Sequence, residues 1–157
     1  MINNTFVSMN TYNLQRFLDA QDSYDSYQSA LEELRQGRKR SHWIWFIFPQ
    51  QKGLGHSYNS EYYGLDGERE AAAYLAHPVL GVRLRECCAA LLQHAHQRTV
   101  GEIMGSGIDV LKLRTSMRLF NSIAPHDVFA QILQEMFGEQ PPINEKSHPS
   151  RTANLNC

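Results

Sequence analysis

Apolar residues recur along most of the chain at spacings of three and four, which is the period of an amphipathic α-helix. Polar residues fill the positions between them, so each apolar stripe predicts a helix with one buried face. The segments that follow this pattern are Leu14–Ala20, Asp22–Gln36, Glu68–Ala76, Pro78–His96, Asp109–Ile123 and Val128–Phe137. Together they predict helices packed around one apolar core.

Residue types at the ends of these stripes support the boundaries. Asn13 and Asp127 precede the first and the last stripe, where a short polar side chain can cap free backbone N–H groups. Gly37 and Gly138 follow stripes at the position where helices often end in a left-handed residue. Thr99 is placed to cap a further helical turn.

Two segments lack a clear period. Ser41–Phe48 is rich in aromatic and β-branched residues, so it fits either a short buried helix or a buried strand. We favour the helix, because Ser41 can cap it and Pro49 would end it. Gln51–Gly67 contains four glycines among Ser, Asn and Tyr residues, which predicts a long surface loop or a small hairpin within it.

Length and composition set the number of domains. A chain of 157 residues with 42% hydrophobic residues suits one globular domain. We therefore predict an all-α protein of about seven helices. Its single domain should span residues 12–138, between flexible ends at 1–11 and 139–157.

Charge and apolar content limit the classes of partner that the sequence favours. Fifteen basic and sixteen acidic residues give a net charge of −1, which does not favour nucleic acid. The apolar run Trp43–Phe48 is far shorter than the ~20 residues of a membrane-spanning helix. The polar start predicts no secretory leader, and an odd number of cysteines (Cys87, Cys88 and Cys157) fits reduced thiols. These features predict a cytoplasmic protein without a membrane partner; the oligomeric state stays open.

Metal and thiol chemistry receive little support. Cys87 and His94 share a helix face, but Cys88 points about 100° away and no second ligand pair follows. The two cysteines lie among Leu and Ala, where a thiol behaves as a small apolar side chain. We predict neither a metal nor another cofactor.

Two polar-aromatic segments are the candidate site. The first, Arg38–Gln50, runs from three cations and a histidine into two tryptophans and ends in a glutamine. Flat rings suit a base or sugar, cations suit phosphate, and an amide supplies paired donors and acceptors. The alternative is a core helix with a solvated basic entrance.

The second segment begins at Asp109. Helical steps of three and four place Asp109, Lys112 and Ser116 on one face, beside an apolar stripe. A lysine in that position either reaches into a cleft or extends its ammonium to solvent.

The chain resembles domain-of-unknown-function family 1810, sometimes labelled calpastatin-like. The matching stretches are Leu14–Gln21, Ala30–Ser57, Glu70–Cys87 and Gly107–Phe120. The resemblance implies a mainly helical fold and no known activity. In its helical class and its mixture of aromatic, lysine and carboxylate residues, the chain is also similar to the NADAR (NAD and ADP-ribose associated) proteins. That likeness implies cleavage of N-glycosidic bonds of ribosyl compounds.

The first hypothesis is therefore a metal-independent hydrolase of N-glycosidic bonds in a nucleotide or ADP-ribose derivative. In it Asp109 stabilises an oxocarbenium-like state, and His42 or Lys112 protonates the leaving base. The groups that would hold the ligand are Trp43, Trp45, Lys39, Gln50 and Ser116. The alternative is a non-catalytic helical module that binds a nucleotide or a protein through the same face.

Overall fold

Nearly every apolar stripe forms a helix in the computed structural model, which describes residues 12–140. The α-helices are α2 (Gln15–Asp22), α3 (Ser26–Gln36), α4 (Ile44–Ile47), α5 (Tyr58–Tyr62), α6 (Gly67–Ala76), α7 (Leu80–Leu92), α8 (Val100–Met104), α9 (Gly107–Ile123) and α10 (Val128–Phe137). A short 3₁₀ segment, Ser23–Asp25, joins α2 to α3. The predicted all-α, single-domain fold is confirmed.

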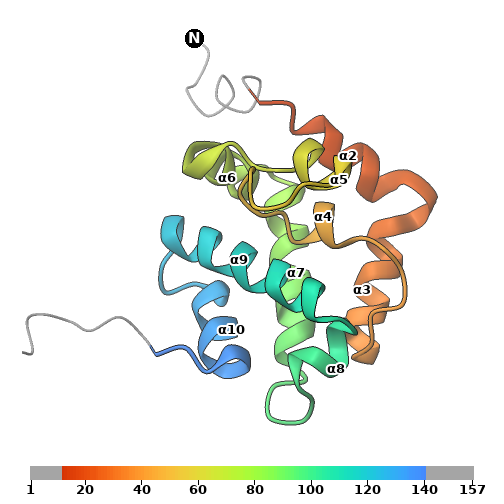
Figure 1. The fold of residues 1–157 in the computed structure, drawn as a ribbon, viewed down its shortest axis with the longest axis vertical. Helices are drawn as coiled ribbons and strands as arrows, with labels where there is room; N and C mark the ends of the chain where they lie inside the picture. Colours follow the sequence, from red (N-terminus) through yellow and green to blue (C-terminus); the bar gives the residue numbers. More distant parts are fainter. Residues whose placement is uncertain (1–11, 141–157) are drawn as a thin grey trace, which may run out of the picture.

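Helix α7 runs through the middle of the molecule, and α9 crosses it (Figure 1). Helix α7 packs against α3, α6 and α10, while α9 packs against α6, α8 and α10. Helices α2, α4, α5 and α6 gather at the end of the molecule where the described chain begins (Figure 1). The buried apolar side chains form one core cluster, so the described helices share a single core.

The stripe of α9 shows how the sequence positions this core. Leu113, Met117 and Phe120 follow the predicted spacing and are fully buried. Ser116 lies within the same buried stripe, although the sequence placed it on a ligand-binding face. The four side chains lie on one face because residues three and four apart in a helix are neighbours. Helix α9 thus has its buried face fixed along most of its length.

Several predicted caps are present and two are not. Asp127 and Thr99 accept backbone N–H groups at the starts of α10 and α8, and Gly138 ends α10 at φ 69°. Asn13 is not the cap of α2, because that helix begins one residue later and has no side-chain cap. Ser41 is not the cap of α4, because its hydroxyl binds the carboxylate of Glu33.

Helix α3 also begins later than the sequence predicts. Tyr24 and Asp25 have φ of 51° and 53°, in the left-handed region that interrupts an α-helix. The predicted helix from Asp22 therefore divides into the 3₁₀ segment and α3. Its end is as predicted, with Gly37 at φ 78°.

The glycine-rich segment 51–67 holds more structure than a surface loop. It contains α5, capped by the hydroxyl of Ser57. Its two ends meet in one isolated parallel bridge between Gln51 and Leu65, in place of the hairpin. This bridge closes the segment into a compact unit that presents α5 toward α4.

The predicted flexible ends lie mostly outside the residues that the structure describes. Predictions for residues 1–11 and 141–157, Cys157 included, fall outside the described residues. Glu139 was predicted to begin the flexible end, but it is held against α9, because its carboxylate binds Arg114 and Arg118. Among residues 12–140, no helix has the length and apolar character needed to cross a membrane.

The start of α7 yields a test of pH-dependent stability. The Nδ1 atom of His77 accepts the backbone N–H groups of Val79 and Leu80, at 3.1 and 3.2 Å. Burial lowers the pKa of His77, so the folded protein favours the neutral ring that can accept these bonds. The bonds therefore contribute stability above the unfolded pKa of about 6.5, and this contribution falls as the pH drops toward the folded value.

We expect the wild type to lose up to about 1 kcal/mol, the usual worth of a helix cap, relative to His77→Asn between pH 7.5 and pH 5.5. The asparagine oxygen can accept the same backbone groups and does not titrate in this range. Urea unfolding of both proteins at the two pH values measures the difference. Parallel pH dependence of the two proteins would contradict the assignment.

Candidate functional site

A single carboxylate shapes the segment between α3 and α4. The Oε1 atom of Glu33 accepts the backbone N–H groups of Arg40 and Ser41 at 2.7 and 3.0 Å and the indole N–H of Trp43 at 2.9 Å. Its Oε2 atom accepts the hydroxyl of Ser41 at 2.5 Å. Burial alone would raise the pKa of Glu33, but these donors outweigh it and lower the pKa. The ionised carboxylate thus fixes the entrance to α4.

The same segment is tied to α9 by Lys39. Its Nζ donates to the carbonyl of Ser41 at 2.6 Å and pairs with the carboxylate of Asp109 at 3.0 Å. The ammonium also lies 4.9 Å from the centroid of the Trp43 ring. The Lys39 side chain is only 6% exposed, so this ion pair belongs to the folded framework.

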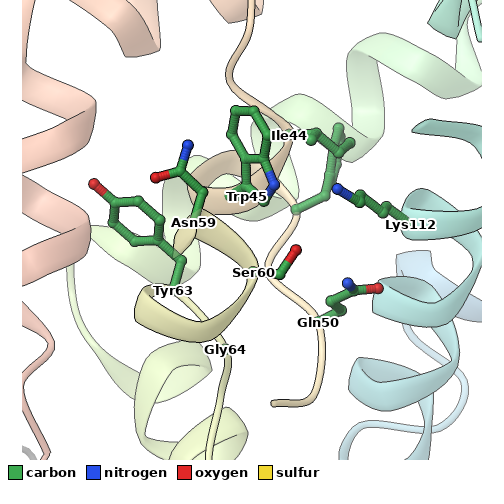
Figure 2. A pocket seen from close by; sticks show the side chains of 9 residues that line it. Ile44, Trp45, Gln50, Asn59, Ser60, Tyr63, Gly64 and Lys112 are labelled. Atoms are coloured by element: carbon green, nitrogen blue, oxygen red, sulfur yellow. The ribbon is translucent and has the colours of Figure 1, made fainter. Parts of the chain in front are cut away.

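A small cavity with room for about 10 Å³, roughly one water molecule, lies between α4, α5 and α9. Its walls are apolar on one side and polar on the other. The lining residues are Ile44, Trp45, Phe48, Gln50, Asn59, Ser60, Tyr63, Gly64 and Lys112. Figure 2 shows Lys112 reaching from α9 toward Trp45, with Ser60 and Gln50 bordering the space between them. The arrangement is a small amphipathic pocket with one cationic wall.

Lys112 supplies the charge of this pocket. Its Nζ lies 5.1 Å from the centroid of the Trp45 ring, a cation–π contact like that of Lys39 with Trp43. The side chain is half-buried, yet no carboxylate of residues 12–140 lies within salt-bridge distance of it. An unpaired, half-buried ammonium in a cavity is the kind of group that marks a binding site.

The amide of Gln50 is oriented by α9. The hydroxyl of Thr115 donates to Oε1 of Gln50 at 2.5 Å, with a longer contact of 3.0 Å to the carbonyl of Lys112. With the amide oxygen engaged on the α9 side, the amide nitrogen faces the side of Gly55 and Ser60. Gln50 therefore presents N–H groups to the cavity (Figure 2).

Helix α5 forms the opposite wall. The Ser57 hydroxyl donates to Oγ of Ser60 at 2.9 Å and accepts the backbone N–H of Ser60. Gly55 is required here, because a Cβ at that position would lie 2.5 Å from Oγ of Ser60. Gly64 is likewise required, because its Cβ would lie 2.6 Å from Cα of Lys52. The two glycines let the chain close tightly around this wall.

A second, more open cavity of about 350 Å³ meets the first at Gly64. At its base Arg16 and Glu70 form a buried ion pair at 2.9 Å. Arg16 also donates to the carbonyls of Tyr62 and Gly64, at 2.8 and 3.0 Å. This arginine anchors the chain just after α5 to α2 and α6, which holds the wall of the smaller cavity from behind.

The predicted site residues fall into four places. Trp45, Gln50 and Lys112 line the smaller cavity, and Lys39, Trp43 and Asp109 form the buried framework cluster. His42 is exposed and does not line the cavity, and Ser116 is enclosed in the core. The predicted pairing of Asp109 with His42 or Lys112 as carboxylate and acid is therefore not assembled in this cavity.

The sequence did not single out four residues that shape the site. Glu33 orders the segment before α4, and Thr115 orients Gln50. Ser60 lies in α5 and Tyr63 directly follows it, and the glycine-rich composition hid this helix. Ser57 as a capping residue, with the acidic Glu61 in the first turn after it, is the signal that predicts a helix at this place.

The described cysteines are buried, as predicted. Burial raises the pKa of Cys87 to about 12 and that of Cys88 well above its usual value, which keeps both thiols protonated. Within residues 12–140, no group of three or more His, Cys, Asp or Glu side chains is placed to hold a metal ion.

Comparisons with known proteins give one family and one solved structure. Residues 11–146 match the model of a family described as a protein of unknown function, DUF1810. The crystal structure of a conserved hypothetical protein from Mycobacterium tuberculosis is 44% identical, with a TM-score of 0.75 over 82% of this chain and 89% of that chain. No curated protein gives a significant match.

The role of Glu33 can be tested by replacing its carboxylate with an amide. Glu33→Gln keeps the shape of the side chain and can leave an oxygen for the three N–H groups that donate to Oε1, but it removes the negative charge and places an NH₂ group where the Ser41 hydroxyl donates to Oε2. Because hydrogen bonds to a charged group contribute roughly 1.5–3 kcal/mol each, we expect a loss of about 2 kcal/mol or more in the free energy of unfolding. Urea unfolding followed by tryptophan fluorescence measures this loss.

The matched control is Glu32→Gln at the neighbouring, exposed position. Glu32 accepts only one long hydrogen bond, from the Gln36 side chain at 3.3 Å. Glu32→Gln should therefore change the free energy of unfolding by less than about 0.5 kcal/mol. Equal losses in the two variants would contradict a special role for Glu33.

Proposed function

The chain belongs to the DUF1810 family of unknown function, so from the cavity itself we propose that it is a small-molecule binding module for a nucleotide-like ligand. In this proposal one ring-bearing part of the ligand packs at the mouth of the pocket between α4, α5 and α9. Trp45 and its apolar neighbours contact the ring, and Lys112 contacts the negative charge. No catalytic step is part of the proposal.

The observation that carries the proposal is the pairing of Trp45 with an unpaired Lys112. The ring and ammonium lie 5.1 Å apart inside a cavity that also presents the Gln50 amide. Ligand pockets typically combine apolar and aromatic walls with a few converging polar groups. Phe48 and Ile44 are almost wholly buried at the apolar wall, so the half-buried ring of Trp45 is the aromatic surface left for a ligand.

The volume of the cavity limits what enters it. Pockets that enclose a whole drug-sized molecule usually measure about 300–1,000 Å³, whereas this cavity has room for only about 10 Å³, roughly one water molecule. A ring or a sugar is too large for that space. We therefore propose that the ring of the ligand packs on Trp45 at the mouth of the cavity and that only a small polar group enters it.

Binding is favoured over N-glycosidic hydrolysis by the placement of the carboxylate. Stabilising an oxocarbenium-like state needs a carboxylate that faces the sugar. None of the nine residues that line the cavity is Asp or Glu, and the Asp109 carboxylate is engaged by Lys39. The proposal therefore adopts the binding alternative for this cavity.

A cytoplasmic location accompanies the proposal. Cys87 and Cys88 are free thiols, which suits a reducing compartment where nucleotides are abundant.

A thermal-shift screen of nucleotides, nucleosides and ADP-ribose derivatives tests the proposal. We expect at least one of them to raise the melting temperature of the wild type, because a ligand that binds only the folded state stabilises it. Lys112→Met should keep the fold, since the stem still packs, but weaken binding of a phosphate-bearing hit by about tenfold. Titration calorimetry measures that ratio.

Lys52→Met is the matched control, because Lys52 is an exposed lysine that does not line this cavity. Its affinity should stay within about twofold of the wild type. A panel without any hit, or equal losses in both lysine variants, contradicts the proposal. Mass spectrometry of each hit after incubation should show it unchanged; a released base would instead favour the hydrolase.

A further inference from the structure

We infer that the polar end of the cavity is a site for an oxyanion, a carboxylate or phosphate group attached to a ring that packs at the mouth of the cavity. This inference rests on the proposed binding function and names the group that the site selects. Its basis is that the polar atoms facing the cavity are donors. A donor-only site favours a ligand group that only accepts hydrogen bonds.

A similar lysine–tryptophan pair in the same molecule shows which partner such an ammonium takes. Lys39 lies over Trp43 and Lys112 lies over Trp45, with ammonium-to-ring distances of 4.9 and 5.1 Å. The first ammonium has the carboxylate of Asp109 at 3.0 Å, whereas the second has no such partner among residues 12–140. A bound oxyanion would give Lys112 what Asp109 gives Lys39.

Gln50 adds directed donors to that charge. A glutamine amide can present either its oxygen or its nitrogen to a ligand. The short bond from Thr115 engages the oxygen, so the NH₂ group is left for the cavity. Thr115 is therefore a positioning residue that makes Gln50 a donor.

Two further donors face the same space. The indole Nε1 of Trp45 is shielded from solvent and has no hydrogen-bond partner among the described residues. Ser60 accepts the hydroxyl of Ser57, which leaves its own hydroxyl hydrogen available. In Figure 2 the indole nitrogen, the Ser60 oxygen and the Lys112 nitrogen point toward one region of the cavity. A buried N–H without a partner is unfavourable, so an acceptor at this place is stabilising.

The hydrogen-bond acceptors near this wall do not face Lys112. The carbonyl of Gly64 faces Arg16 and accepts its guanidinium at 3.0 Å. The amide of Asn59 and the hydroxyl of Tyr63 point away from Lys112 in Figure 2. Burial raises the pKa of Tyr63, so this phenol stays neutral and adds no negative charge to the wall.

Two pairs of probes test the inference with the wild-type protein. Benzoate and benzamide share a ring and a shape, but only benzoate is a pure acceptor. Adenosine 5′-monophosphate and adenosine differ by the phosphate. We expect at least a tenfold preference for the charged member in one pair, measured by calorimetry, and the preferred pair identifies the source of the oxyanion.

Three variants separate a binding role from a structural one. Gln50→Glu places a like charge at the site and should abolish the preference for the charged probe. Thr115→Val lets the Gln50 amide rotate, so it should reduce the preference about fivefold, whereas Thr115→Ser keeps the hydroxyl and should retain it. A purely structural role for Thr115 would alter the melting temperature without altering this ratio.

The outcomes distinguish this inference from the proposed function. If each neutral probe binds as tightly as its charged counterpart, the oxyanion site is wrong and the binding module stands. If neither pair nor any nucleotide binds, the proposed function fails as well. A preference that survives Gln50→Glu overturns the inference, because the anion would then lie elsewhere.

Discussion

The ionised carboxylate of Glu33 is the constraint on which the site depends. It fixes two backbone N–H groups, a serine hydroxyl and the indole of Trp43, so the chain between α3 and α4 has one path. Because Trp43 is thereby held in the core, the short helix that follows must direct Trp45 toward α9. A residue on α3 thus decides which of the two tryptophans lines the cavity.

A second polar group plays the same part on the opposite wall. Arg16 joins two carbonyls just after α5 to the buried carboxylate of Glu70. Buried charges are unfavourable unless they are paired and hydrogen-bonded, and here most donors of the guanidinium are engaged. The cavity therefore lies between two segments that lack long helices; the half-buried Glu33 holds one, and the buried Arg16 holds the other.

Much of the fold could be predicted because its information is local. Helix α10 has an apolar stripe, a capping Asp127 and a terminal Gly138 within twelve residues, and all three are where the sequence placed them. The site was less predictable because its contacts are not local. Helical spacing put Asp109 beside Lys112, but Asp109 binds Lys39, seventy residues earlier. Spacing also cannot tell a ligand-facing serine from Ser116, which shares the buried stripe.

The separation of the two lysine–tryptophan pairs has an evolutionary consequence. Lys39 is bound into the framework, so its replacement would disturb folding and function together. Among residues 12–140, Lys112 is the one charged side chain that lines the cavity, and it is absent from the ion pairs that hold the helices. Under the proposed binding function, selection could therefore change this position while the scaffold is preserved.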